Sequence, residues 1–220
     1  MSTLHIDSVT KSFGSRKVLQ DIFLSCKTGT ITGILGRNGE GKSTLLKIIF
    51  GTVKGDHQFI KLDHKILRNQ SDRKSRIAYL PQEFFLPKGC KIKNLIPLFC
   101  NNENAEKLYK LDIIAPFLDQ TSRSLSGGEK KIVETLLSAF SDAEFILLDE
   151  PFNGLSPKVT EEMKNLIKEQ AVDKGFIISD HRYEEVLDIS DEIYLLSDTH
   201  LKKIKDFKEL QLHNYLPKNI

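Results

Sequence analysis

The 220-residue chain contains no tryptophan, only two methionines and three cysteines. Cys26, Cys90 and Cys100 are odd in number, lie far apart and form no Cys-x-x-Cys pair. They therefore indicate neither a disulfide framework nor a zinc site. We expect all three to be small, buried apolar residues in a reducing compartment.

The chain also lacks an excess of charge of either sign. Lysine and arginine number 32 and aspartate and glutamate number 30, which leaves a net charge of +2. A protein whose main partner is nucleic acid usually carries a strongly basic face. We therefore expect no nucleic-acid partner.

Long apolar runs are missing as well, and none approaches the roughly 20 residues that a membrane-spanning helix needs. The first twelve residues, MSTLHIDSVTKS, are polar and lack the apolar centre of a signal peptide. We expect a cytoplasmic chain. If it works at the cell membrane, it would be peripheral on the inner face, with other chains spanning the bilayer.

Short apolar strands alternate with helical segments along most of the chain. The sequence predicts strands at 4–9, 30–35, 77–80, 145–148, 176–179, 192–196 and 201–205. It predicts helices at 43–50, 130–140, 157–171 and 183–187. Such α/β alternation with apolar strands is typical of a mainly parallel sheet covered on both faces. Residues 83–124 contain three prolines and break the alternation, so we expect a helical insertion there.

A glycine-rich loop connects the strand predicted at 30–35 to the helix predicted at 43–50. It reads GRNGEGKS, which matches G-x-x-x-x-G-K-[S/T] in full. In such loops, backbone N–H groups and the start of the next helix bind phosphates. Lys42 can reach the β- and γ-phosphates, the Ser43 hydroxyl can bind Mg²⁺, and we expect the Glu40 side chain to point outward. The phosphate-binding residues predicted here are Gly36, Arg37, Asn38, Gly39, Glu40, Gly41, Lys42, Ser43 and Thr44.

A second motif, FILLDE, ends the strand predicted at 145–148 with two carboxylates, Asp149 and Glu150. Ligands of α/β sheets bind at the carboxyl ends of the strands. Adjacent strand residues point in different directions, so the two carboxylates can have separate roles. We assign Asp149 to Mg²⁺ or its water shell, and Glu150 to the attacking water.

A third motif, LSGGE at 125–129, precedes a predicted helix. The free N–H groups at the start of this helix, together with the Ser126 hydroxyl, can bind a terminal phosphate. Together the three motifs resemble the ATP-binding-cassette (ABC) family of ATPases. The resemblance implies an α/β P-loop NTPase fold of ABC type, with a mainly parallel sheet core, an N-terminal antiparallel β part and a helical insertion. It divides the single domain into a core at 1–82 and 125–220 and a helical subdomain at 83–124.

The resemblance also implies ATP and Mg²⁺ as ligands, and a dimer of cassettes. In the family, the signature of one subunit closes over ATP held by the phosphate loop of another. Ser126, Gly127 and Gly128 would take that part here, in a homodimer or heterodimer that encloses two ATP molecules.

Three single residues match further family positions. Gln82 in YLPQ resembles the glutamine that contacts Mg²⁺ or its water, and His181 in ISDHR resembles the histidine that contacts the γ-phosphate. Phe13 in KSFG stands where the family places an aromatic residue that stacks on adenine; the alternative is a core phenylalanine. Ser156 departs from the pattern, because much of the family has an aspartate there that couples the two ATP sites. Strict coupling is therefore in doubt, whereas hydrolysis is not.

Several functions are compatible with these motifs. The resemblance favours the motor subunit of a transporter with a separate transmembrane permease, and the PFNGLSP and YLPQE segments are similar to cassettes of lipopolysaccharide export and branched-chain amino acid uptake. The alternative is a soluble ABC ATPase that drives assembly or remodelling, as in iron–sulfur assembly. A small-molecule kinase would leave LSGGE and His181 unexplained.

An apolar cluster, Phe84, Phe85 and Leu86, follows Gln82 directly. It either packs inside the insertion or forms a partly exposed groove for a short helix of the permease.

Overall fold

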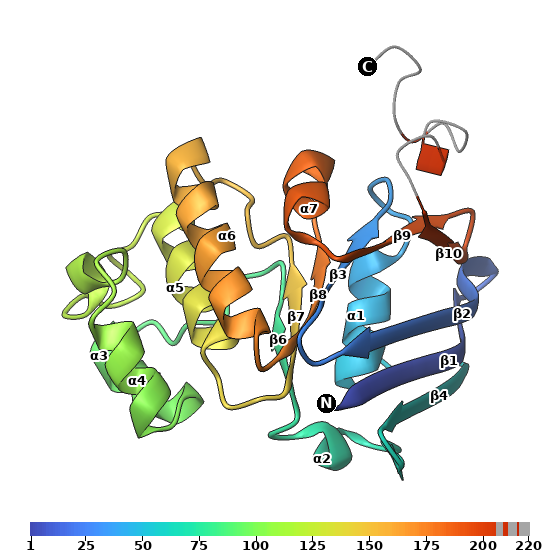
Figure 1. Cartoon of the computed structure of the whole chain (residues 1–220), viewed down its shortest axis with the longest axis horizontal. Coiled ribbons are helices and arrows are strands. Elements are labelled where there is room, and N and C mark those ends of the chain that lie inside the picture. Colours follow the sequence, from blue (N-terminus) through green and yellow to red (C-terminus); the bar gives the residue numbers. More distant parts are fainter. Residues whose placement is uncertain (206–208, 211–214, 216–220) are drawn as a thin grey trace.

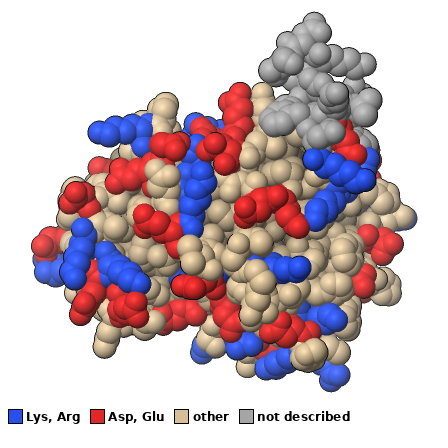
Figure 2. Space-filling view, viewed as in Figure 1, with Lys and Arg blue, Asp and Glu red and all other residues tan. Residues whose placement is uncertain are grey.

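The computed structural model describes residues 1–205, 209–210 and 215, which form two sheets and the helices that cover them (Figure 1). One sheet has the strand order β2-β1-β4-β5 and the other β10-β9-β3-β8-β7-β6. Among the described residues, no helix combines the length and the apolar character needed to span a membrane. On the face shown in Figure 2, acidic and basic side chains are interspersed.

The first sheet is the antiparallel part implied by the family resemblance. Its strands are β1 (Thr3–Phe13), β2 (Arg16–Lys27), β4 (His57–Leu62) and β5 (Lys65–Ile66), all paired antiparallel. Of these four strands, the sequence predicted only part of β1, at 4–9, and it predicted none of the other three. The alternation in β2 is interrupted at Asp21, which has a positive φ of 50°, and the β1–β2 register shifts there. Such bulges disturb the period of two on which strand prediction depends.

The second sheet confirms the expected parallel core. It consists of β3 (Ile31–Leu35), β6 (Ile77–Leu80), β7 (Phe145–Asp149), β8 (Gly175–Ser179), β9 (Glu192–Ser197) and β10 (His200–Ile204). Neighbouring strands are parallel except for β10, which pairs antiparallel with β9. The predicted strands lie at these positions, with small differences at their ends.

The described helices are α1 (Lys42–Phe50), α2 (Gln70–Arg73), α3 (Ile92–Phe99), α4 (Asn102–Tyr109), the 3₁₀ helix η1 (Ala115–Phe117), α5 (Gly127–Ala139), α6 (Pro157–Ala171) and α7 (Tyr183–Ile189). The elements α3, α4 and η1 make up the helical insertion between β6 and α5. Helix α5 begins earlier than predicted, because Ser126 and Glu129 form a capping box at its first turn.

Strand β7 shows how the core is built, since successive side chains of a strand point to opposite faces. Phe145 and Leu147 pack with residues of α1 and the antiparallel sheet. Ile146 and Leu148 pack with residues of α5 and α6 on the other face. Helix α1 therefore lies between the two sheets, and α5, α6 and α7 cover the opposite face of the parallel sheet (Figure 1).

The cysteines only partly match the expectation. Cys26 and Cys100 are buried, and burial raises the pKa of both thiols to about 12. Cys90 is exposed, because it lies in the surface loop that precedes α3. The prediction that it would be buried was wrong.

Candidate functional site

The carboxyl ends of four parallel strands, β3, β8, β7 and β6, lie side by side at one edge of the larger sheet. Each strand leads directly into a predicted functional segment. β3 leads into the glycine-rich loop, β6 into Gln82, β7 into Glu150 and β8 into His181. Strand topology thus brings together residues that are far apart in the sequence.

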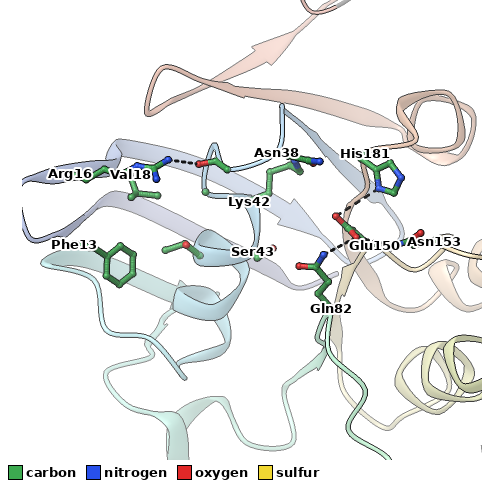
Figure 3. Close-up of a pocket in the computed structure, with 13 residues that line it drawn as sticks. Phe13, Arg16, Val18, Asn38, Lys42, Ser43, Gln82, Glu150, Asn153 and His181 are labelled. Atoms are coloured by element: carbon green, nitrogen blue, oxygen red, sulfur yellow. Dashed lines mark hydrogen bonds and ion pairs between the residues drawn. The ribbon is translucent and has the colours of Figure 1, made fainter. Parts of the chain in front are cut away.

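A cavity of about 690 Å³ opens at this edge (Figure 3). Ten of the predicted residues line it: Phe13, Asn38, Gly39, Gly41, Lys42, Ser43, Thr44, Gln82, Glu150 and His181. Arg16, Val18 and Asn153 line it too and were not predicted. In Figure 3 the phosphate loop and Phe13 lie on one side, and Gln82, Glu150 and His181 lie on the other.

The glycine-rich loop depends on glycine at Gly41, where φ is 109° and a Cβ atom would lie 2.6 Å from the Val18 side chain. Lys42 follows it and is buried, with its Nζ atom donating to the carbonyl oxygens of Gly36, at 2.6 Å, and Arg37, at 3.1 Å. Burial lowers the pKa of Lys42, while the nearby carboxylates of Glu150 and Asp149 act to raise it. A cation beside the N-terminus of α1 makes this part of the cavity suited to an anion.

Glu150 is the carboxylate that faces the cavity. Its Oε2 accepts hydrogen bonds from Nε2 of Gln82, at 3.1 Å, and Nδ2 of Asn153, at 3.3 Å. Its Oε1 lies 3.8 Å from Nδ1 of His181 (Figure 3). Three polar side chains therefore surround one partly buried carboxylate, an arrangement that can orient and deprotonate a water molecule.

The backbone of Glu150 is in the left-handed region, with φ at 53°. This conformation is uncommon for a residue other than glycine and persists where the surroundings hold it. The Glu150 N–H donates to the carbonyl of Ser179 at 2.7 Å. The chain thus leaves the direction of β7 at Glu150, which directs its side chain away from that of Asp149.

Asp149 remains within β7 and is 1% exposed. Its Oδ1 accepts a hydrogen bond from the Ser179 hydroxyl, at 2.7 Å, and its Oδ2 accepts one from the Tyr79 hydroxyl, at 3.2 Å. Asp149 lies outside the lining of the cavity, and both oxygens of its carboxylate are bound by neighbouring hydroxyl groups. The two adjacent carboxylates have separate environments, as their positions in the sequence suggested.

The site offers oxygen ligands that suit Mg²⁺. The Ser43 hydroxyl and the Gln82 amide lie on the cavity wall. Within the described part of the chain, no group of three or more histidine, cysteine, aspartate or glutamate side chains is arranged to hold a metal ion. Mg²⁺ commonly retains several waters and shares its coordination with substrate phosphates. The residues present fit that mode of binding.

Other predicted residues lie outside the cavity. Glu40 points outward as expected, and its Oε2 accepts the N–H of Asp198 at 3.2 Å. Ser126, Gly127 and Gly128 form the start of α5, where Ser126 caps the helix reciprocally with Glu129. One chain therefore does not bring the LSGGE segment to its own glycine-rich loop.

Two of the unpredicted residues support predicted ones. Nη2 of Arg16 donates to the carbonyl of Gly39 at 3.1 Å and braces the loop. Asn153 comes three positions after Glu150 in a tight turn and donates a hydrogen bond to its carboxylate. Its polar side chain, so close in sequence to the proposed catalytic carboxylate, could have identified it as a site residue. Phe13 is 54% exposed beside the cavity, so the alternative of a core phenylalanine is wrong.

Comparisons with known proteins agree with this arrangement. The family model described as ABC transporter matches residues 19–153. The lipopolysaccharide export system ATP-binding protein LptB of Haemophilus influenzae is 32% identical over 211 residues, covering 89% of this chain and 87% of LptB. The probable sulfate/thiosulfate import ATP-binding protein CysA of Chlorella vulgaris is 27% identical over 220 residues, covering 94% of this chain and 93% of CysA.

Solved structures share the whole fold. An ATP-binding cassette of an ABC transporter in its ADP conformation superposes with a TM-score of 0.77 at 26% identity, covering 99% of this chain and 96% of that one. The ATP binding subunit of another ABC transporter superposes with a TM-score of 0.84 at 20% identity, covering 98% and 94%.

Proposed function

The chain belongs to the ABC transporter family of ATP-binding proteins, and from this membership we propose that it hydrolyses Mg·ATP as the motor subunit of a transporter with a separate permease. The observation that carries the proposal is the position of Glu150, which accepts hydrogen bonds from Gln82 and Asn153 in a cavity that also contains Lys42.

The residues of the cavity have separate roles in ATP hydrolysis. Lys42 and the first N–H groups of α1 bind the terminal phosphates of ATP, and Phe13 stacks on the adenine ring. Glu150 orients a water and accepts its proton as the water oxygen bonds to the γ-phosphorus and the bond to the leaving ADP oxygen breaks. Gln82 and Asn153 hold the carboxylate in place, and His181 contacts the γ-phosphate.

Mg²⁺ would be held by the Ser43 hydroxyl and the Gln82 amide oxygen, with Asp149 acting through a bound water. When bound, the ion offsets negative charge on the phosphates.

A dimer would complete the site. Ser126, Gly127 and Gly128 lie outside the cavity of their own chain, which supports their use over the ATP of a second cassette. We therefore propose a head-to-tail homodimer or heterodimer with two ATP molecules between the subunits.

The permease would dock in an apolar groove of about 430 Å³ next to the site. Its lining residues are Lys47, Phe50, Thr52, Val53, Tyr79, Pro81 and Phe85. Of the cluster that suggested such a groove, Leu86 is 8% exposed and packs in the core, whereas Phe84 is 51% exposed. Leu86 therefore does not belong to the docking surface. A short apolar helix suits a groove of this composition.

We further propose that residues 83–124 act as a helical subdomain, which contributes Phe85 to this groove. The chain would work in the cytoplasm at the inner face of the membrane. The relatives compared above are named as parts of one export and one import system. We therefore assign the direction of transport to the permease and not to this chain.

Affinity purification from detergent-solubilised membranes tests the transporter role. The tagged chain should retain a polytopic membrane protein after washing, and a Thr52→Glu variant in the groove should lose it. Recovery of soluble partners alone would favour the assembly ATPase and contradict the proposal.

A further inference from the structure

The loop after β8 binds the backbone of Phe152, in the turn after β7, at both its N–H group and its carbonyl group. The N–H of Phe152 donates to Oδ2 of Asp180 at 3.2 Å, and the carbonyl of Phe152 accepts from Nη1 of Arg182 at 3.1 Å. The N–H of Arg182 in turn donates to Oδ1 of Asp180 at 2.9 Å. Since the Phe152 side chain is fully buried, both its backbone and its side chain are held.

This turn determines where Glu150 lies. Glu150 begins the turn in a left-handed conformation, and Asn153 near its end donates a hydrogen bond to the Glu150 carboxylate. A conformation of this kind is strained for a residue other than glycine and requires surroundings that hold it. The contacts on Phe152, between these two residues, are placed to do so.

Arg182 is itself anchored on two helices. Its Nη1 also donates to the Thr160 hydroxyl of α6 at 3.3 Å, and its Nη2 donates to Oε1 of Glu185 in α7 at 2.5 Å. The planar guanidinium can donate to all of these acceptors at the same time, because its N–H groups point in different directions. A lysine ammonium on its flexible stem is less suited to bind several acceptors in fixed directions.

The same charge cluster contains a second cation, Lys164, which is more deeply buried than Arg182. Lys164 of α6 pairs with Glu185 at 3.1 Å, with Asp188 at 2.6 Å and with Glu161 at 2.7 Å. Its side chain is 7% exposed. Among the described residues its ion-pair partners are these three carboxylates and not Phe152, which makes Lys164 a matched control for Arg182.

We propose that Arg182 is a positioning residue for hydrolysis, because its guanidinium holds the Phe152 carbonyl and thereby the turn that presents Glu150. The inference rests on the proposed ATPase function. Arg182 lies outside the lining of the nucleotide cavity, so it acts through Glu150 and not on ATP.

Steady-state kinetics of the full chain test this role with Arg182→Ala. We expect kcat to fall by up to about 10²-fold, the effect of misplacing a catalytic group by an ångström. The KM for ATP should not change, because the phosphate loop is untouched. Millimolar guanidinium ion should restore part of the lost rate. Lys164→Ala should keep the parental kcat and show no gain with guanidinium, although it loses ion pairs of the same cluster.

Hydrogen–deuterium exchange gives a readout that is independent of activity. Peptides covering 150–156 should exchange faster in Arg182→Ala and at the parental rate in Lys164→Ala. If Arg182→Ala does not fold, Arg182→Lys replaces it. That variant keeps the charge but not the planar arrangement of five donors, and should show a smaller change in the same direction.

Measuring the parental protein and Glu150→Gln in parallel separates the two proposals. If Glu150→Gln hydrolyses ATP at the parental rate, the proposed function fails, whatever Arg182 does. If Glu150→Gln is inactive while Arg182→Ala keeps parental kcat and parental exchange, the positioning role is overturned. Equal losses of kcat in Arg182→Ala and Lys164→Ala, without guanidinium rescue, also overturn it.

Discussion

Nε2 of Gln82 donates a hydrogen bond to Oε2 of Glu150 across 3.1 Å, joining the ends of β6 and β7. The residue before Gln82, Pro81, lines the apolar groove. One step along the backbone therefore separates the proposed docking surface from a direct contact with the proposed general base. A displacement of the groove would therefore move Gln82 and, through its hydrogen bond, the Glu150 carboxylate.

Glu150→Gln should keep ATP binding and lower hydrolysis by roughly 10²–10⁴, the range for a lost general base. It should also accumulate an ATP-bound dimer, because hydrolysis no longer opens it. Phosphate release and size-exclusion chromatography with ATP measure the two effects. Glu40→Gln is the control, since that carboxylate faces the Asp198 N–H and lies outside the cavity. A near-parental rate in Glu150→Gln would show that another group takes the proton.

Lys42→Ala should weaken the binding of ATP far more than that of adenosine. The substitution removes a cation that would contact phosphates and no group that would contact the base. Calorimetric titration with both ligands measures the difference, with Lys47→Ala, in the neighbouring groove, as control. Equal losses for both ligands would show that the substitution had damaged the fold.

Phe85→Glu should abolish co-purification with the membrane chain while leaving ATP hydrolysis intact. The Phe85 ring packs against Phe99 with a centroid distance of 5.9 Å, so this variant should also lose some thermal stability. Thr52→Glu, at an exposed position of the same groove, provides a second variant with little stability cost. Lys110→Glu in the insertion, outside the groove lining, is the control. Normal partner binding by both groove variants would remove this surface from consideration.

Ser156→Asp should make ATP hydrolysis cooperative, whereas the parental protein should show independent sites. Ser156 is exposed at the N-cap of α6, where an acidic side chain is favoured by about 0.3–1 kcal/mol. Thermal stability should therefore not decrease, and a change in the ATP dependence would come from communication between subunits. Strong cooperativity in the parental protein would contradict this view of Ser156.

The parallel core could be predicted from the sequence because its strands are short, apolar throughout and separated by helices. β3, β7 and β8 are buried at every residue, a pattern that requires no knowledge of their partners. The antiparallel strands gave a weaker signal. β2 and β4 mix buried and exposed residues irregularly, and bulges shift their pairing with β1.

Within the site, local motifs were predictable and contacts between motifs were not. Lys42 and Ser43 follow from a continuous pattern of eight residues. The contacts of Arg16 with the loop and of Arg182 with Phe152 join segments that only the fold brings together. The left-handed backbone of Glu150 likewise depends on neighbours from β8, so no inspection of FILLDE alone would reveal it.

The separation of Ser126 from the cavity that contains Lys42 has a genetic consequence. Each chain carries two unlike half-sites, and each composite site of the proposed dimer takes one half from each chain. A mixed dimer of a Lys42→Ala chain and a chain altered at Ser126 combines both defects in one site and leaves the other site intact. Two recessive alleles of this kind should therefore complement each other in the same cell, whereas two alleles of the same half-site should not.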